Sequence, residues 1–444
     1  MKQNQNFSET IFALSSGRLP SGVAVIRISG SKTRFVIETI CGNLPSPRRA
    51  ELRTFRDSLG SPVDRGLVLF FSNPHSFTGE DCGEFHLHGG RAVVDAMISL
   101  LYTFDNCRLA EPGEFTRRAF ANGKFDLTVA EGLADLIAAE TDGQRRLALQ
   151  IASGSQVQLY SSWRTEMIRA RALIEAELDF ADESDVPSSV SDQVWISMRD
   201  LAEKIEQHVA EGKRGAIVRD GFRVVIVGAP NAGKSSLLNA LAGTDVAIVS
   251  DEPGTTRDLI EIKLDLGGLP VLITDTAGLR ETEGKVEQIG VERALDRAHA
   301  ADLVLLLTDM ASPLPAPFVE LDAIDTLRIG TKLDVVERTT SDSYDLKVSI
   351  RSGEGLNDLI AALQSRAESA AGNLSDPLPT RRRHMELLTE TSREINHAVA
   401  DVAAPLEVRA EYLRRASHAL GRITGDVDVE DILDVVFSQF CIGK

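Results

Sequence analysis

A glycine-rich segment in the middle of the chain carries the residue types that bind phosphate groups. Gly228–Ser235 fits the pattern G-x-x-x-x-G-K-S/T, between the apolar strand-like run Arg223–Val227 and a helix-like run that opens at Ser236. Its glycines let successive backbone N–H groups and a helix N-terminus face a triphosphate. Lys234 would then reach the β and γ phosphates, and the Ser235 hydroxyl would hold Mg²⁺. A chance glycine-rich turn is the weaker interpretation, because strand, loop, Lys-Ser pair and helix occur in the required order.

Two further segments have the spacing of loops that sense the γ-phosphate. Asp275-Thr-Ala-Gly278 follows the strand-like run Val271–Thr274. A carboxylate at a strand end can reach the Mg²⁺ shell, and the Gly278 N–H can contact the γ-phosphate and be released on hydrolysis. Gly254-Thr-Thr-Arg-Asp258, which lies between the two motifs, offers a threonine hydroxyl and a carbonyl to the metal. We interpret both segments as switch loops.

The segment Thr331-Lys-Leu-Asp334 is predicted to recognise the base of the bound nucleotide. The Asp334 carboxylate can accept from N1–H and the 2-amino group of guanine, whereas adenine offers neither donor. The usual guanine motif begins with asparagine where Thr331 stands, and Val348-Ser-Ile-Arg places Ile350 where alanine is common. Guanine preference is therefore expected through Asp334, and the effect of both departures on affinity stays open.

One position departs from Ras-like enzymes. Leu279 stands where those enzymes place a glutamine that orients the attacking water. Transition-state charge must therefore be stabilised in another way. Asn231 of the phosphate loop suggests one, because several GTPases with asparagine there use a monovalent cation that bridges the phosphates.

Composition excludes several classes of protein. The chain has 444 residues with 43% hydrophobic and 26% charged, as in an ordinary globular protein. A net charge of −18 argues against a broad basic surface that grips nucleic acid unaided, although a local patch such as Arg381–His384 remains. Four scattered cysteines without a C-x-x-C pair favour reduced thiols. With a polar N-terminus and no apolar run near the ~20 residues of a membrane span, we expect a cytoplasmic protein that does not contact a membrane.

Pattern changes along the chain divide it into domains. The first part alternates strand-like and short helical runs, the next is helical, the third alternates strand and helix as in a doubly wound parallel sheet, and the last is helical again. Some sixty helical residues are too few to build a core of their own, so we expect them to pack on the earlier helices. The predicted fold is multidomain α/β, with an N-terminal α+β domain, a central α-helical domain and a Ras-like doubly wound P-loop G domain inserted in the helical domain. The expected bounds are 1–123, 124–218 with 375–444, and 219–374.

A few polar residues interrupt the strands of the N-terminal domain. Arg27 lies inside an apolar run and Glu84 opens another, and on sequence alone a solvated strand face is the favoured interpretation. His86 and His88 share one face and raise the question of a metal. No third ligand has recognisable spacing, so ordinary packed or surface histidines are favoured.

Over its whole length the chain resembles the MnmE (TrmE) family of tRNA uridine 5-carboxymethylaminomethyl modification GTPases. Several independent motifs in one order carry the resemblance: Val25–Gly30, Ser76–Asp81, His88–Gly90, Pro112–Thr116, Gly123–Leu127, Ala130–Ile137, Gly254–Asp258, Asp275–Arg280 and the terminal Phe440–Lys444.

The resemblance implies an enzyme that hydrolyses GTP and depends on K⁺ and Mg²⁺, with hydrolysis driven by pairing of two G domains. It implies a homodimer formed through the N-terminal domains, and a heterotetramer with the FAD-containing partner MnmG (GidA). The complex would modify the wobble uridine of certain tRNAs with a carbon from a tetrahydrofolate derivative, 5-formyl or 5,10-methylene. The acidic net charge is compatible with action on tRNA if the partner supplies much of the tRNA-binding surface.

The resemblance also assigns roles to single residues. Predicted catalytic residues are Lys234, Glu287 and Cys441; a solvated switch-loop charge is the alternative for Glu287, and the chemical role of Cys441 stays open. Predicted contacts to GTP are Asn231, Ala232, Gly233, Lys234, Ser235, Ser236, Ser250, Thr255, Thr256, Asp275, Thr276, Ala277, Gly278, Lys332, Asp334 and Ser349. Mg²⁺ falls to Ser235 and Thr256, K⁺ to Asn231, Ser250, Glu252 and Thr255, and folate to Arg27, Glu84, Lys124 and Lys444.

Two other functions compete with this interpretation. One is a GTP-switched ribosome-assembly or RNA-binding factor without modification chemistry. Such proteins commonly follow the G domain with a basic RNA-binding domain, whereas this chain is acidic and ends in a helical segment and Cys-Ile-Gly-Lys444. The other is a folate-binding structural protein without GTPase activity, which conflicts with intact Lys234, Ser235, Thr256 and Asp275.

Overall fold

The computed structural model describes residues 7–179, 189–248, 261–275, 298–313, 325–336, 343–373, 377–427, 433, 436–438, 440 and 443. The chain divides into two compact units. The first comprises Met1–Ala134, Ile151–Arg199 and Arg393–Lys444, and the second Asp135–Gln150 and Asp200–Ser392. No helix among the described residues is long and apolar enough to cross a membrane.

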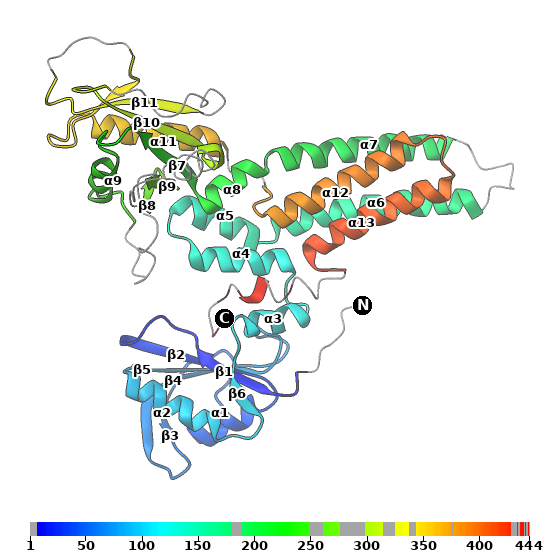
Figure 1. Ribbon diagram of the computed structural model, residues 1–444. Helices are drawn as coiled ribbons and strands as arrows, with labels where there is room; N and C mark the ends of the chain where they lie inside the picture. The colour runs from blue at the N-terminus through cyan, green and yellow to red at the C-terminus, as the bar shows by residue number, and fades with distance from the viewer. Residues whose placement is uncertain are drawn as a thin grey trace, which may run out of the picture. The chain divides into compact units, whose positions relative to one another are not determined.

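A six-stranded sheet forms the N-terminal part of the first unit, in the order β3-β4-β5-β2-β1-β6 (Figure 1). Neighbouring strands pair antiparallel, except that β1 and β6 are parallel. The strands are β1 (Thr10–Leu14), β2 (Ser21–Ser29), β3 (Glu51–Arg56), β4 (Pro62–Phe71), β5 (Cys82–Gly89) and β6 (Cys107–Leu109).

Helices α1 (Thr33–Cys41) and α2 (Arg91–Tyr102) share one core with this sheet. Side chains alternate between the faces of a strand, so Ile26 and Ile28 of β2 face the helices. Arg27, which lies between them, therefore points to the opposite face. Helix α3 (Glu114–Ala121) contributes to that second side, where its Phe115 joins a smaller apolar cluster with β1.

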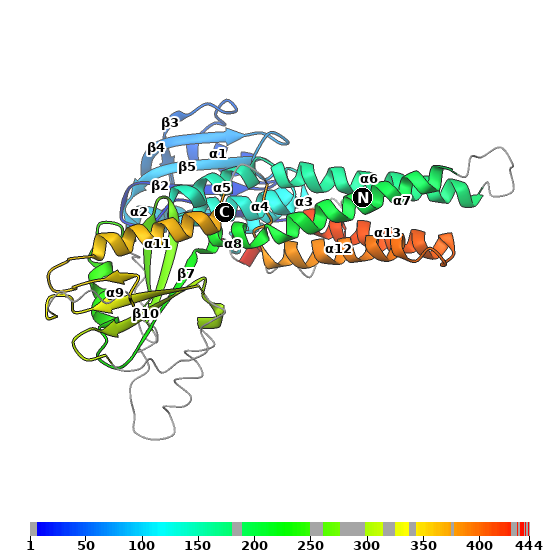
Figure 2. The same ribbon diagram turned by 90° about the horizontal axis from the view of Figure 1, so that it is seen from above.

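Long helices form the rest of the first unit. Helix α13 (Leu406–Thr424) packs against α6 (Ser155–Asp179), and the two lie side by side in both views (Figures 1 and 2). Buried Arg409 of α13 lies 3.5 Å from the ring centre of Trp195 in α7 (Ser189–Ala210) and donates to the Ala398 carbonyl of α12 (Arg382–Ala400) at 2.7 Å. The prediction that the C-terminal helices pack on the earlier ones is confirmed.

The sheet of the second unit runs β12-β11-β10-β7-β9-β8. All neighbours pair in parallel except the edge strand β8, which pairs antiparallel with β9 and was not itself predicted. The predicted doubly wound parallel sheet is confirmed, since such sheets often carry one antiparallel edge strand. A short hairpin joins β8 to β9, whereas a parallel pair would need a long crossover. The strands are β7 (Phe222–Gly228), β8 (Glu261–Leu266), β9 (Leu269–Asp275), β10 (Leu303–Asp309), β11 (Thr326–Thr331) and β12 (Leu346–Lys347).

Helices pack against this second sheet. They include α8 (Gly212–Asp220), α9 (Lys234–Ala242) and α11 (Leu356–Ala371), which all contact its strands. Strand β7 is buried along almost its whole length because helices cover both faces of the sheet. Among the helices that the structure describes, four contribute residues to both units: α7, α12, α4 (Leu127–Ala138) and α5 (Asp142–Ala152).

Two buried histidines lie in the parts of α7 and α12 that belong to the second unit. His208 is 8% exposed and His384 is 1% exposed. Burial, together with the nearby charge of His384, lowers the pKa of His208 to about 4. The unfolded chain therefore binds a proton at this position at a higher pH than the folded chain does.

This difference predicts a pH dependence of stability. Since the folded pKa lies below the unfolded value of about 6.5, stability should fall as pH drops below that value and should level off near 4. Between pH 7 and pH 5 the loss is about 2 kcal/mol. His208→Leu should abolish this part of the pH dependence, measured by urea unfolding with hydrogen exchange of α7 and α12 peptides. Exposed His299→Leu is the control, and an unchanged slope in His208→Leu would contradict the assignment.

Candidate functional site

The ends of four strands meet at one edge of the second sheet. Because β7, β9, β10 and β11 are parallel, their carboxyl ends lie on the same side. In register, Gly228 pairs with Leu307, Asp275 with Ile226, and Asp309 with Thr331. The predicted phosphate, metal and base motifs therefore follow neighbouring strands, which is where open α/β sheets bind ligands.

The phosphate loop joins β7 to α9 through two left-handed residues. Asn231 has φ 63° and Gly233 has φ 94°. Glycine adopts this conformation without strain, and asparagine tolerates it better than most residues. Lys234 opens α9, and its Nζ donates to the carbonyls of Gly228 at 2.9 Å and Ala229 at 3.0 Å. These bonds hold the ammonium group against the loop that is predicted to surround the phosphates.

The next side chain of α9 meets the end of β9. The Ser235 hydroxyl donates to Asp275 Oδ2 at 2.7 Å, and Asp275 is only 1% exposed. A hydroxyl and a carboxylate are hard oxygen ligands of the kind that Mg²⁺ takes. Their convergence fits the predicted metal site. Ala232 is buried inside the loop, whereas Ser236 is exposed on α9.

The base motif is braced by two side-chain pairs. Lys332, left-handed with φ 62°, donates from Nζ to Asp309 Oδ2 at 2.6 Å. Burial works to raise the pKa of Asp309, but the hydrogen bonds from Lys332 and the Ala311 backbone N–H outweigh it and lower the pKa. The Ser349 hydroxyl donates to Asp334 Oδ1 at 2.7 Å, so Asp334, Lys332 and Ser349 occupy one region beside the phosphate loop.

Thr331 ties this region to the phosphate loop. Its hydroxyl, fully buried, lies 2.8 Å from the Ala232 carbonyl and 3.2 Å from the Thr308 carbonyl, both acceptors. Ile350 also backs the loop, because a Cβ at Gly233 would lie 3.5 Å from its Cδ1. The two departures from the usual guanine motif thus fill structural positions behind the loop.

Several predicted site residues lie outside the described part of the chain and stay predictions. In the second unit these are Ser250, Glu252, Thr255, Thr256, Thr276, Ala277, Gly278, Leu279 and Glu287, and at the C-terminus Cys441 and Lys444.

A second cluster of predicted residues lies on the face of the N-terminal sheet opposite to α1 and α2. Arg27 and Glu84 are register partners on β2 and β5, and Arg27 donates to Glu84 Oε1 from Nε at 3.1 Å and Nη2 at 2.9 Å. The rings of Phe77 and Phe115 lie 5.4 and 5.8 Å from the Arg27 guanidinium carbon. The side chains of the pair remain 24% and 18% exposed, so solvent can still reach them.

The neighbouring histidines take part in pairs rather than in a metal cluster. His86 Nε2 lies 3.4 Å from Glu84, and His88 Nδ1 lies 2.8 Å from Asp64. Hydrogen bonds from His88 lower the pKa of Asp64 although burial works to raise it. The residues that the structure describes include no group of three His, Cys, Asp or Glu side chains placed to hold a metal.

Lys124 reaches the same neighbourhood through the loop that follows β4. Its Nζ donates to the Pro74 carbonyl at 2.7 Å, and the ring of Phe125 lies 5.9 Å from that of Phe77. Arg27, Glu84 and Lys124 are therefore gathered around one loop.

Gly443, near the C-terminus, lies against the end of β1. The Ser15 hydroxyl donates to the Gly443 carbonyl at 2.8 Å. Gly443 has φ +98°, and a Cβ there would lie 2.2 Å from the Leu14 carbonyl oxygen, so only glycine fits. Leu14 follows Ala13, the register partner of Arg27. Gly443, the described residue of the terminal Cys-Ile-Gly-Lys, thus lies one strand away from Arg27.

Some site residues were missed by sequence reasoning. Asp309, Phe77 and Phe115 were not singled out, and the tether made by Thr331 was not foreseen. Asp309 ends a strand beside the base motif, a position that offers a usable signal. The two phenylalanines offer none, since apolar residues near a strand are common in any core.

Comparisons with known proteins cover nearly the whole chain. A family model described as "GTP-binding protein TrmE N-terminus" matches residues 10–124, and one described as "MnmE helical domain" matches residues 127–441. The chain is 63% identical over 444 residues to the Brucella canis protein and 62% identical to the Brucella anthropi protein, both named "tRNA modification GTPase MnmE". In the first case 100% of each chain is covered. The G domain of the T. maritima FeoB iron transporter covers 34% of this chain and 99% of its own at 26% identity, with a TM-score of 0.27 that is too low to identify a shared fold.

The Thr331 tether predicts an effect on guanine nucleotide binding. Thr331→Val keeps the shape but leaves the buried Ala232 carbonyl without its hydroxyl donor, a change that costs ~1–3 kcal/mol. We expect the variant to bind a fluorescent guanine nucleotide about tenfold more weakly in an equilibrium titration. Thr331→Ser retains the hydroxyl and should bind like the unmodified protein. Equal affinity in the valine variant would contradict the tether.

Proposed function

Since the chain belongs to the MnmE family of tRNA modification GTPases, we propose that it hydrolyses GTP and uses the hydrolysis cycle to modify the wobble uridine of certain tRNAs. The observation that carries the GTPase part is the convergence of Lys234, Ser235 and Asp275 at one sheet edge. We further propose domain bounds of 1–123 for the folate and dimerisation domain, 124–218 with 375–444 for the helical domain, and 219–374 for the G domain.

In this proposal GTP binds along the carboxyl ends of the parallel strands, with its phosphates at one loop and its base at another. The phosphate loop, with Lys234 beneath it, receives the β and γ phosphates, and Ala232, Gly233 and Ser236 bind through the loop and the start of α9. Asp334 accepts from the guanine edge while Ser349 holds its carboxylate in place. Lys332, fixed by Asp309, lies beside the base. This arrangement orients the γ-phosphate before any chemistry takes place.

The proposed metal sites combine residues of the phosphate loop and the start of α9 with residues of the predicted switch loop that precedes β8. Mg²⁺, held by Ser235 and Thr256, would neutralise charge that develops on the phosphates. K⁺, held by Asn231, Ser250, Glu252 and Thr255, would supply further positive charge across the phosphates, as an arginine finger does elsewhere. Asn231 is exposed and has a left-handed backbone conformation, so its side chain is accessible to a bound cation, which supports this role. Glu287 would orient the attacking water, and contacts from Thr276, Ala277 and Gly278 would sense the γ-phosphate.

The proposed folate site lies around Arg27, on the face of the N-terminal sheet opposite to α1 and α2. A tetrahydrofolate derivative has a flat ring edge with N–H donors and a carboxylate tail. Glu84 can accept from such donors, Arg27 and Lys124 can pair with carboxylates, and Phe77 offers an apolar ring surface beside them. The position of Gly443 one strand from Arg27 would bring Lys444 and Cys441 toward the same ligand.

The proposed assembly follows from family membership. We propose a cytoplasmic homodimer through the N-terminal domains and a heterotetramer with FAD-containing MnmG (GidA), which would contribute to tRNA binding. The alternative, a GTP-switched ribosome-assembly factor, lacks a comparable basis in this chain. The paired charges around Phe77 and the anchored C-terminal tail have no use in a simple switch.

The cation mechanism predicts a dependence on the salt. Replacing KCl by NaCl at equal ionic strength should lower GTP turnover about tenfold or more, because one charge in the transition state loses its partner. Phosphate release with both salts measures the effect. Asn231→Ala should remove most of the difference between salts, and equal turnover in both salts with the unmodified protein would refute the cation site.

The proposed role of Cys441 predicts a separation of activities. Cys441→Ser should abolish modification while GTP hydrolysis stays near normal, because the C-terminal tail and the phosphate loop belong to different parts of the fold. Mass spectrometry of wobble nucleosides from a deletion strain, complemented with either gene, measures the first activity. If the Cys441→Ser gene restores the modified nucleoside, the proposed role of Cys441 is contradicted. If the unmodified gene fails to restore the modified nucleoside, the proposed function is contradicted.

A further inference from the structure

The hairpin between β8 and β9 has the tightest turn that two strands permit. Leu266 and Leu269 are register partners, so only Gly267 and Gly268 form the loop. Their φ angles are +65° and +85°. Two-residue loops with positive φ at both positions match the twist of paired strands and favour glycine. The tip of this hairpin is therefore narrow and fixed in direction.

One side of the hairpin contacts the start of α5. The Gly143 N–H donates to the Gly268 carbonyl at 2.8 Å. A Cβ at Gly143 would lie 2.5 Å from that carbonyl oxygen, so any larger residue would displace the hairpin. Lys263, on β8, forms an ion pair with Glu140 just before α5. Backbone contact and ion pair bind the hairpin to the same short segment.

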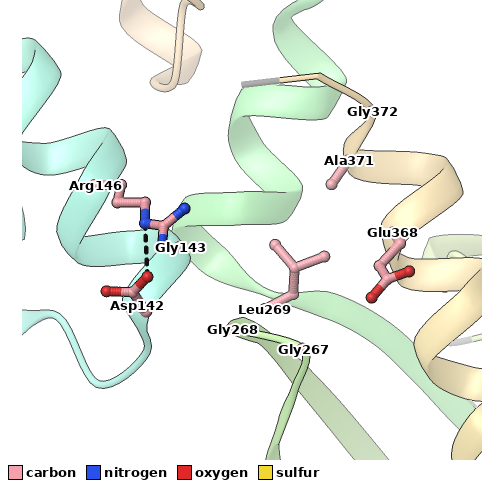
Figure 3. A pocket seen from close by; sticks show the side chains of 9 residues that line it. All are labelled: Asp142, Gly143, Arg146, Gly267, Gly268, Leu269, Glu368, Ala371 and Gly372. Atoms are coloured by element: carbon pink, nitrogen blue, oxygen red, sulfur yellow. Dashed lines mark ion pairs between the residues drawn. The ribbon is translucent and has the colours of Figure 1, made fainter. Parts of the chain in front are cut away.

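Helix α11 contacts the other side of the tip. A Cβ at Gly267 would lie 2.7 Å from Glu368 Oε1 and 2.8 Å from Gln364 Nε2. Figure 3 shows the two turn glycines between α5, with Gly143 and the Asp142–Arg146 ion pair, and α11, with Glu368. A pocket of about 230 Å³ lies at this junction and is lined by residues of α5, the hairpin turn and the end of α11.

The segment that receives the hairpin is also tied to the points where the chain enters and leaves the second sheet. Asp135 accepts from Arg219, at the end of α8, at 3.3 Å and from Arg381, just before α12, at 2.7 Å. The Gln144 side chain donates to the Arg219 carbonyl at 2.8 Å. Residues 135–150 therefore cluster with the G domain, although the family's helical model begins at residue 127.

The far end of α5 packs elsewhere. Its last residues, Ile151 and Ala152, belong to the first unit, where they crowd against Gly132 of α4. A Cβ at Gly132 would lie 2.8 Å from both the Ala152 nitrogen and Ile151 Cγ2. One continuous helix thus has its first residues against the hairpin and its last residues in the other unit.

The hairpin joins the two predicted switch loops. Gly254–Asp258 precedes β8, and Asp275–Gly278 begins at the last residue of β9. We infer that Asp135–Gln150 is a coupling segment, positioned on the hairpin by Gly143 and Glu140, through which the nucleotide state of both switch loops reaches α5. This inference rests on the proposed GTPase function and adds the residues that transmit its signal.

The test measures hydrogen exchange of the full chain, without nucleotide and with GDP, aluminium fluoride, MgCl₂ and KCl. In the unmodified protein, amides of α5 should change protection together with those of the phosphate loop. In Gly143→Ala and in Lys263→Glu, the nucleotide-dependent change in α5 should fall at least twofold while the phosphate loop responds normally. The charge-swapped double variant Lys263→Glu, Glu140→Lys should recover the response.

Gly243→Ala is the matched control, since a Cβ there would lie no closer than 3.6 Å to the Ala240 carbonyl oxygen. It should behave like the unmodified protein. Two results would overturn the coupling segment alone. One is a nucleotide-dependent change in α5 exchange that stays normal in Gly143→Ala. The other is an unmodified protein in which nucleotide changes the exchange of the phosphate loop but not that of α5. If nucleotide leaves the hydrogen exchange of the phosphate loop unchanged in the unmodified protein, the proposed GTPase function is overturned, and the coupling with it.

Discussion

Parallel pairing of β7, β9, β10 and β11 is the constraint on which the nucleotide site depends. It places four strand ends at one edge, so residues as far as 99 positions apart in the sequence form hydrogen bonds there. The buried Thr331 hydroxyl beside the Ala232 carbonyl makes the consequence concrete, since it links the phosphate loop to the base motif across the sheet. Strand β7, which leads into the phosphate loop, is buried at every position except Arg223, so the loop begins from a packed strand.

How far the sequence predicts such a site depends on the range of the interactions. The order of strand, loop and helix around Lys234 is local, and its pattern predicted the fold of the G domain. The antiparallel edge strand β8 was not predicted, because alternation of strand and helix does not report the direction of a strand joined by a hairpin. The pairing of Asp309 with Lys332 depends on register between β10 and β11, which no local pattern specifies. Short strands such as β6, with three residues, carry too few side chains for periodicity to identify them.

In the N-terminal sheet, charge burial explains why isolated polar residues were hard to interpret. Arg118 is 1% exposed and forms ion pairs with both Glu80 and Glu114. Burial works to raise the pKa of Glu114, but hydrogen bonds from Arg108 and Arg118 lower it overall. A buried charge without such partners would cost several kcal/mol. A single arginine in an apolar run therefore indicates either solvent or a partner, and only the register of the sheet distinguishes the two.

The hairpin between the switch loops shows how a local turn rule and a tertiary contact select the same residues. A longer loop could bend and would absorb a displacement of either strand, whereas a two-residue loop between six register pairs moves with both. Gly267 and Gly268 satisfy the positive φ angles that this turn requires. They also leave room for α5 and α11, since a side chain at Gly267 would collide with Glu368. Replacing the turn would therefore alter its geometry and its contacts together, which ties the direction of the hairpin to the position of α5.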